Sequence, residues 1–212
     1  MKKGLPVAVI VAFIGIAVAV WVGQSPEKAP EPEADAAAST GDLDVSQLKD
    51  PENALVLQLS TGGPVIIEMY PDKAPNHVAR FKELSRQGFY DGVVFHRVIE
   101  GFMAQTGDPT GTGTGGSGQN IAAEFNDVPH ERGTVSTARS GHPDSADSQF
   151  FIVFDRAPHL DGQYTAFGRV VAGMDYVDAI TKGPASQNGN VPASERDSIV
   201  TARVAADVTD AE

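Results

Sequence analysis

One short stretch of the sequence brings together side chains that could act on a ligand. In residues 95–108, FHRVIEGFMAQTGD, an arginine, a phenylalanine, a methionine and a glutamine follow one another closely, at Arg97, Phe102, Met103 and Gln105. An arginine stays charged at any physiological pH and offers fixed hydrogen-bond donors. On strands, Arg97 and Gln105 could reach one surface, while Phe102 and Met103 would sit at a bend.

A second stretch adds another amide and another aromatic side chain. In residues 148–154, SQFFIVF, Gln149 and Phe151 are two positions apart and therefore share one face of a strand. A phenylalanine at this spacing, taken alone, is more often a core residue, and that interpretation stays open here. The combination of one arginine with several aromatics and amides favours a functional site.

Three other sequence patterns could suggest a functional site, but each is better explained without one. GTGTGG, residues 111–116, has the spacing of a dinucleotide-binding motif, but Asp108-Pro109 precedes it, so we expect a plain loop. SGHPD, residues 140–144, holds a serine, a histidine and an aspartate, yet catalytic triads assemble from distant segments, so we expect a turn. The five histidines form no i, i+4 pair and the chain has no cysteine, so we expect no metal site and no cofactor.

Short strands between glycine turns must position these side chains. A helix is predicted at 75–87, with Pro75 in its first turn and Gly88 at its end, and a second at 174–182. Short spacings favour an antiparallel barrel over βαβ units. The strand-like segments are 54–60, 64–70, 93–99, 102–107, 133–138, 148–154, 164–170 and 197–204.

The N-terminal part of the chain has a different character. Two lysines precede an apolar run over 5–22, which as a helix would span about 27 Å, close to the ~30 Å hydrocarbon core of a bilayer. Residues 1–23 therefore predict a single-pass anchor in the cell membrane with the rest of the chain on the exported, periplasmic side. The alternative is a signal peptide cut after Ala19, which would leave a soluble periplasmic or secreted protein. Residues 24–53, rich in Pro, Ala and acids, predict a disordered linker.

The length and composition of the chain limit the number of domains it can form and the classes of partner it can bind. The 212 residues leave room for one domain, expected at 54–206, and a tail at 207–212. A net charge of −12 argues against a nucleic-acid binder, which needs a basic surface to displace counterions. No obvious apolar interaction stripe is present, so a monomer is expected.

The motifs together resemble one known family. FHRVIxGFMxQxGD, GTGTGG, SQFFI and LDGxYxxFGxV follow in this order, and the match runs from about Asn53 to Val204. This pattern closely resembles the cyclophilin family of peptidyl-prolyl cis-trans isomerases. The resemblance implies a mainly β fold, a closed eight-stranded antiparallel β-barrel capped by two α-helices. It also implies proline-containing polypeptides, unfolded or exported, as the partners.

The resemblance implies a role for each residue of the site. Arg97 matches the catalytic arginine, and Gln105 and Gln149 match the amides that bind substrate backbone and orient the arginine. The proline-ring pocket would consist of Phe102, Met103, Phe151 and Leu160, and its surroundings of Gly113, Ala138, Arg139, Ser140, His159 and Tyr164.

Three of these positions depart from the family pattern. His159 stands where many eukaryotic members have a tryptophan that contacts cyclosporin, so we expect weak cyclosporin binding. Tyr164 replaces a common histidine but keeps an aromatic ring with a polar tip. Arg139 replaces a rim asparagine, and because the family uses mainly backbone there, we expect recognition to persist.

Two functions remain to be weighed. The resemblance implies an active isomerase that assists the folding of exported proteins. The alternative is a non-catalytic proline-binding or chaperone module on the same fold. Arg97 favours the isomerase, because a pure binder has no need of it.

Overall fold

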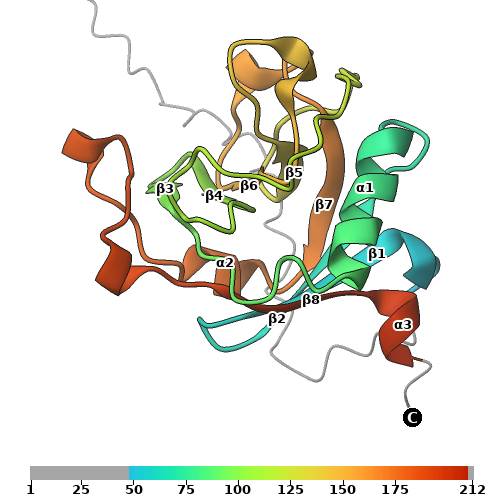
Figure 1. Ribbon diagram of the computed structural model, residues 1–212, viewed down its shortest axis with the longest axis horizontal. Helices are drawn as coiled ribbons and strands as arrows, with labels where there is room; N and C mark the ends of the chain where they lie inside the picture. The colour runs from blue at the N-terminus through green and yellow to red at the C-terminus, as the bar shows by residue number, and fades with distance from the viewer. Residues whose placement is uncertain (1–47, 210–212) are drawn as a thin grey trace, which may run out of the picture. The chain divides into compact units, whose positions relative to one another are not determined.

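The computed structural model describes residues 48–209, which contain one antiparallel eight-stranded sheet curled around a core (Figure 1). The helices are α1 (Pro75–Arg86), α2 (Met174–Asp178) and α3 (Ala205–Thr209). The strands are β1 (Ala54–Leu59), β2 (Pro64–Met69), β3 (Arg97–Ile99), β4 (Met103–Thr106), β5 (Thr134–Thr137), β6 (Phe150–Val153), β7 (Ala166–Ala172) and β8 (Ile199–Val204).

The predicted strands are confirmed, but the predicted closed barrel is wrong. The strands follow the order β3-β4-β6-β5-β7-β2-β1-β8, and β3 and β8 share no ladder, so the curled sheet keeps two edges. The reason lies in the segment predicted as strand 93–99, of which only Arg97–Ile99 pairs with β4. Residues 92–95 instead run beside residues 197–199, with a single bridge between Val94 and Ser198. An irregular segment therefore lies between the two edge strands.

The helix α1 forms as its sequence predicts. Pro75 occupies its first turn, and Gly88 follows its end with a φ of +68°, a conformation that glycine adopts without strain. Val78, Phe81 and Leu84 recur at helical spacing and are buried in the core. α1 therefore covers one side of the core, on the opposite side of the molecule from β3 and β4 in the view of Figure 1.

The other terminal elements differ from expectation. α2 ends at Asp178, four residues before the predicted end of that helix. α3 extends into the segment predicted as a tail, and residues Pro51–Asn53 of the predicted linker form a 3-10 turn capped by the side chain of Asp50. The described fold therefore includes the turn at Pro51–Asn53 and the helix at Ala205–Thr209.

The sheet has a buried face and a functional face, and β6 shows the division clearly. Phe150 joins the main core, while Phe151 joins a smaller cluster with Met103, Val153 and Leu160 on the other side. This follows from the alternation of side chains along a strand. The smaller cluster forms the base of the candidate site.

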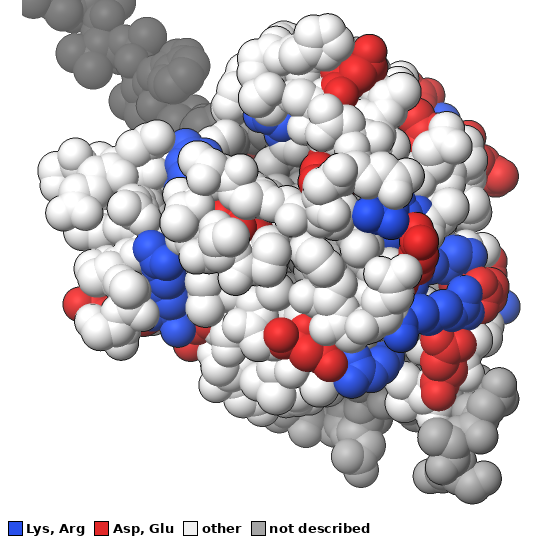
Figure 2. Space-filling view, viewed as in Figure 1, with Lys and Arg blue, Asp and Glu red and all other residues white. Residues whose placement is uncertain are grey.

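Charged side chains of both signs are interspersed around α1 and α3, while the middle of the same face is mostly uncharged (Figure 2). Arg86 on α1 contacts both Glu52 and Asp207, at 2.7 and 2.9 Å, and Lys82 reaches Glu52 at 3.0 Å. Hydrogen bonds from Arg86 and Lys82 lower the pKa of Glu52 to about 2. These exposed pairs tie the two ends of the fold to α1, although each pair is worth at most about 1 kcal/mol.

Buried histidines predict a fall in stability at mildly acidic pH. Burial holds the pKa of His77, His96 and His130 below the ordinary value of histidine. As the pH falls below about 6.5, the unfolded chain binds protons that the folded state does not, which favours unfolding. We expect urea titrations to give a smaller free energy of unfolding at about pH 5.5 than at about pH 7.5. A value that stays constant or rises over this interval would contradict the burial of neutral histidines.

The predicted anchor or signal peptide, 1–23, and most of the predicted linker lie outside the described residues. Within residues 48–209, no helix has the length and apolar character that crossing a membrane requires.

Candidate active site

The strand register places the main site residues in one row across the sheet. Arg97 on β3 lies opposite Gln105 on β4, Gln105 lies opposite Phe151 on β6, and Phe151 lies opposite Ser136 on β5. Residues directly opposite each other on neighbouring strands point to the same face. The sheet therefore brings the arginine, one amide and one aromatic ring together from segments more than fifty residues apart.

An open pocket of about 370 Å³ lies over this row. Its base is apolar: Met103, Phe151 and Leu160 are buried, and the rings of Phe151 and Tyr164 meet edge to face with centroids 5.8 Å apart. Its wall includes exposed His159, whose ring lies 5.4 Å from that of Phe102. The pocket is lined by Arg97, Phe102, Met103, Gln105, Ala138, Arg139, Phe151, His159, Leu160, Gln163 and Tyr164.

A second cavity of about 540 Å³, lined largely by glycines and short polar side chains, shares Gln105, Ala138 and Arg139 with the first. Its lining includes Gly113, Ser140 and Gln149, so the two cavities together contain every residue predicted for the site. The two cavities therefore adjoin: the first contains Arg97 and the apolar base, and the second contains Gln149.

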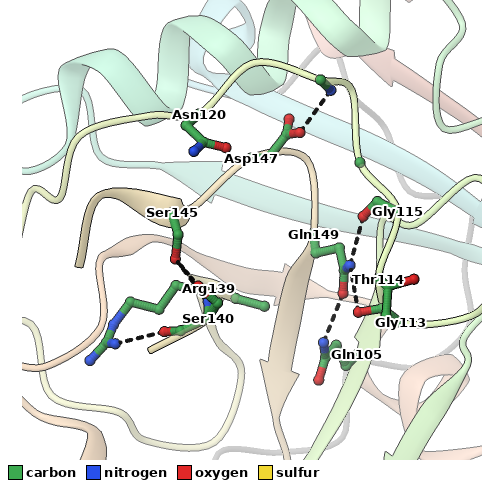
Figure 3. A pocket seen from close by; sticks show the side chains of 13 residues that line it. Gln105, Gly113, Thr114, Gly115, Asn120, Arg139, Ser140, Ser145, Asp147 and Gln149 are labelled. Carbon is green, nitrogen blue, oxygen red and sulfur yellow. Dashed lines mark hydrogen bonds between the residues drawn. The ribbon is translucent and has the colours of Figure 1, made fainter. Parts of the chain in front are cut away.

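A chain of amide hydrogen bonds connects the second cavity to Arg97. Figure 3 shows Gln149 between Gln105 and the glycine-rich loop. Gln149 donates through Nε2 to the carbonyls of Gly113 and Gly115, at 3.1 and 2.8 Å, and its Oε1 accepts from Gln105 Nε2 at 2.9 Å. Gln105 Oε1 in turn accepts from Arg97 Nη1 at 3.3 Å. These contacts fix which end of each amide is oxygen and which is nitrogen.

Asp108 shapes the loop that supplies those carbonyls. Its buried carboxylate accepts the backbone N–H groups of Thr110, Gly113 and Gly115 at 2.6 to 3.1 Å. Burial alone would raise the pKa of this carboxyl group, but the hydrogen bonds outweigh burial and hold the pKa well below its usual range. Residues 111–116 therefore form a loop, as predicted, and its conformation is set by an ionised side chain.

Arg97 reaches the pocket as an unneutralised charge. Besides Gln105, its guanidinium contacts Asn188, donating from Nε to the backbone carbonyl at 3.1 Å and from Nη2 to Oδ1 at 3.2 Å. All three acceptors are neutral, and no carboxylate of residues 48–209 forms an ion pair with it. Partial burial lowers the pKa of Arg97 from its ordinary value, yet an arginine remains charged at physiological pH.

The rim opposite the amide chain is held by Arg139. Its guanidinium carbon lies 4.7 Å from the ring centroid of Tyr164 and 5.7 Å from that of Phe125. Its nitrogens donate to the carbonyls of Gln163 and Ser140. The guanidinium of Arg139, which stands where the family pattern has an asparagine, therefore makes its contacts within the protein. These contacts stabilise the pocket wall that contains Tyr164.

Behind Phe151, a buried hydrogen-bond network supports the pocket. Ser136 Oγ lies 2.8 Å from His130 Nε2, and His130 Nδ1 lies 3.0 Å from Asp161 Oδ1. Since an ionised carboxylate only accepts, Nδ1 carries the proton and Nε2 accepts from the serine. The three residue types are those of a hydrolytic triad, but Ser136 and His130 are fully buried, so no substrate can reach them.

The remaining sequence patterns have structural roles. Residues 140–144 belong to a turn, as predicted, in which Ser140 bonds to Ser145 and His142 accepts from the backbone of Asp144. Within residues 48–209 there is no group of three side chains suited to a metal ion.

The main omission from the sequence-predicted site is Asn188. It lies 91 positions from Arg97 in the chain, yet makes two of the three hydrogen bonds of the guanidinium. The available signal was the Asn188-Gly189 dipeptide, which is typical of a turn with positive φ. That signal predicts the turn but does not indicate what the turn contacts.

Comparisons with known proteins agree with this geometry. Residues 55–204 match the family described as cyclophilin type peptidyl-prolyl cis-trans isomerase/CLD. A probable peptidyl-prolyl cis-trans isomerase of Brucella suis is 49% identical over 183 residues, covering 81% of this chain and 92% of the relative. Peptidyl-prolyl cis-trans isomerase B of Bacillus subtilis is 46% identical over 127 residues, covering 59% of this chain and 88% of the relative.

A solved structure leads to the same family. A cyclophilin-type peptidyl-prolyl cis-trans isomerase of Cryptosporidium parvum, determined in the presence of the dipeptide Ala-Pro, superposes with a TM-score of 0.65 at 29% sequence identity. The match covers 71% of this chain and 98% of that one. Together with the curved antiparallel sheet and the arginine beside an apolar pocket, these matches show that the chain belongs to the cyclophilin-type peptidyl-prolyl cis-trans isomerases.

Proposed function

We propose that Arg97 is the catalytic residue of this isomerase, and that the apolar pocket beside it binds the proline ring of an X-Pro segment. One observation carries the proposal: a half-buried guanidinium without an ion-pair partner in the described residues lies at the edge of a pocket based on Met103, Phe151 and Leu160. A buried charge is normally paired, because desolvation is costly. An unpaired one is available to a ligand.

The reaction needs a hydrogen-bond donor and needs no nucleophile. Rotation of an X-Pro bond is slow because amide resonance imposes a barrier of about 18–20 kcal/mol, although the two isomers differ by only about 0.5–1 kcal/mol. In the twisted transition state, the prolyl nitrogen regains its lone pair and accepts hydrogen bonds better. A guanidinium held beside that nitrogen favours the twisted state over the planar one, and such differential binding accelerates the step.

The pocket supplies the other half of the mechanism. While the proline ring is held against Phe151, the segment that precedes it must rotate, and Gln105 and Gln149 offer amide groups to hold its backbone. Shortening a step from ~100 s to ~1 ms lowers the barrier by about 7 kcal/mol. One preorganised donor supplies about 3–4 kcal/mol of this. Desolvation and orientation of the substrate supply the remainder.

The test is whether the protein changes the rate or the equilibrium. A catalyst accelerates cis-to-trans conversion of an X-Pro peptide in proportion to its own concentration at substoichiometric amounts, and leaves the equilibrium cis fraction unchanged. The alternative function, a proline-binding or chaperone module, would shift the cis fraction only at stoichiometric amounts. Acceleration without such a shift supports the isomerase, and a stoichiometric shift without acceleration would replace it by the module.

We further propose that the chain works at the exported side of a membrane, as a monomer, on unfolded proteins. The apolar run at 5–22 behind two lysines supports this placement. The mass of the mature protein distinguishes the two forms of the proposal. A chain that retains residues 1–19 in the membrane fraction indicates an anchor, and one that begins at Val20 indicates cleavage after Ala19. A full-length chain that never leaves the cytoplasm would contradict both.

A further inference from the structure

We propose that Asn188 is a positioning residue for Arg97, and that its left-handed backbone conformation is what lets one residue hold two nitrogens of the guanidinium. This inference rests on the proposed function of Arg97. The carbonyl oxygen of Asn188 accepts from Nε at 3.1 Å, and its Oδ1 accepts from Nη2 at 3.2 Å. Nε and Nη2 form one edge of the planar guanidinium, so two contacts along that edge fix the plane as well as the position of the group.

The loop that carries Asn188 is fastened to β3 on either side of Arg97. Val98 donates its backbone N–H to Gly189 at 2.7 Å, Gly183 donates to Val98 at 2.9 Å, and Val191 donates to His96 at 3.0 Å. The loop thereby covers the exposed edge of β3, which the open sheet would otherwise leave unpaired. Because the loop is bonded to both neighbours of Arg97, the position of Asn188 relative to the arginine is determined by backbone contacts.

The close approach of this loop requires glycine next to the asparagine. A Cβ atom at Gly189 would lie 2.4 Å from Cγ1 of Ile99 and 2.8 Å from the carbonyl oxygen of Val98. Gly189 has a φ of +75°, and Asn188 before it has a φ of +53°, the one positive φ of a non-glycine residue in the described part of the chain. Asparagine is among the few residues that adopt this conformation readily. Position 188 is therefore occupied by a residue type that tolerates a positive φ and also has a hydrogen-bond acceptor in its side chain.

The neutral oxygens of Asn188 leave the guanidinium charged and partly free. A guanidinium has five N–H groups, of which Asn188 and Gln105 accept three. One N–H on each of Nη1 and Nη2 has no protein partner among the described residues. Asn188 and Gln105 thus orient the group from two sides while two donors remain for the substrate, and no carboxylate reduces the charge that the twisted amide requires.

The experiment compares Asn188→Gly with Gln187→Gly in the full-length protein. Glycine at 188 can keep the backbone conformation and the carbonyl acceptor, and it removes the side chain with its Oδ1 acceptor. Gln187 is exposed in the same loop and its side chain forms no hydrogen bond with Arg97, so it controls for added chain flexibility. We expect kcat for an X-Pro peptide to fall roughly 3- to 10-fold in Asn188→Gly, the effect of one hydrogen bond, with the peptide Kd unchanged. Gln187→Gly should leave kcat unchanged.

Two further readouts separate positioning from a general structural role. In NMR spectra, the Nη2 protons of Arg97, which lose Oδ1 as acceptor, should exchange faster with solvent in Asn188→Gly than in Gln187→Gly. In an Arg97→Ala background, Asn188→Gly should cause no further loss of kcat, because the residue acts through the arginine. An unchanged kcat in Asn188→Gly, or an equal loss in the Arg97→Ala background, overturns this inference. An unchanged kcat in Arg97→Ala overturns the proposed function instead.

Discussion

Replacement of Arg97 by alanine is expected to lower kcat/KM for an X-Pro peptide at least 100-fold, equivalent to about 2.7 kcal/mol of transition-state stabilisation. The guanidinium of Arg97 forms no ion pair within residues 48–209 and lies over the pocket row of β3, β4 and β6. Its removal takes away the donor that the twisted amide needs but leaves the apolar base of the pocket in place. A coupled assay of cis-to-trans conversion measures the loss.

Arg97→Lys is the matched comparison. Lysine keeps the positive charge but lacks the planar fork that contacts Asn188 and Gln105. We therefore expect most of the activity to be lost in this variant as well. If Arg97→Lys retains wild-type kcat/KM, a charge alone suffices and the oriented fork is not required. If Arg97→Ala loses less than about 10-fold, corresponding to about 1.4 kcal/mol, another group performs the main step.

Phe81→Ala is expected to lower the free energy of unfolding by about 3–5 kcal/mol. Phe81 on α1 is fully buried and stacks on Phe167, with ring centroids 4.2 Å apart, and it also meets Tyr90 and Phe150 at 5.9 and 5.6 Å. Truncating such a residue costs about 3–5 kcal/mol through lost burial and a residual cavity. A domain of this size has a total stability of only about 5–15 kcal/mol. Urea unfolding should show the loss as a lower midpoint with an unchanged slope.

The exposed Phe125 provides the control for this prediction. Its side chain is 41% exposed, so Phe125→Ala should cost less than about 1 kcal/mol. Phe81 belongs to the main core and Phe151 to the separate pocket cluster, so kcat/KM of Phe81→Ala measured well below its unfolding midpoint should stay near wild type. Equal destabilisation by the two substitutions would contradict the assignment of Phe81 to the centre of the core.

Local sequence patterns predicted the helices and strands of the fold better than they predicted whether the sheet closes into a barrel. Short strand-like runs between glycine turns predicted all eight strands, and the spacing of Val78, Phe81 and Leu84 predicted α1. Whether β3 pairs with β8 depends on where residues 92–95 leave the sheet, and no local pattern encodes that choice. α3 was missed for a related reason: its five residues follow β8 directly and are held by tertiary contacts with β1 and the turn at Pro51–Asn53.

The residues of the site were predicted from the sequence, but the residues that hold them in position were not. Motif resemblance identified Arg97, Gln105 and Gln149, and the structure places them in contact, although their catalytic roles remain proposals. Asn188 and Asp108 act through contacts that only the folded chain creates. Asp108 shapes the loop whose carbonyls orient Gln149, and Asn188 approaches Arg97 from a loop that crosses the edge of β3. Positioning contacts of this kind carry no signature of their own in a sequence.

The most direct test of the central claim is exchange NMR on an X-Pro peptide with the wild-type protein and with Arg97→Ala. The method reports binding, through shifted protein resonances, and rotation, through exchange between the cis and trans peptide signals. We predict that both proteins bind the peptide with similar Kd, and that rapid cis-trans exchange occurs with the wild type and is reduced at least 100-fold in Arg97→Ala, about 2.7 kcal/mol. Binding without accelerated exchange in the wild type, or equal exchange in both proteins, would contradict the claim that Arg97 drives rotation of the prolyl bond.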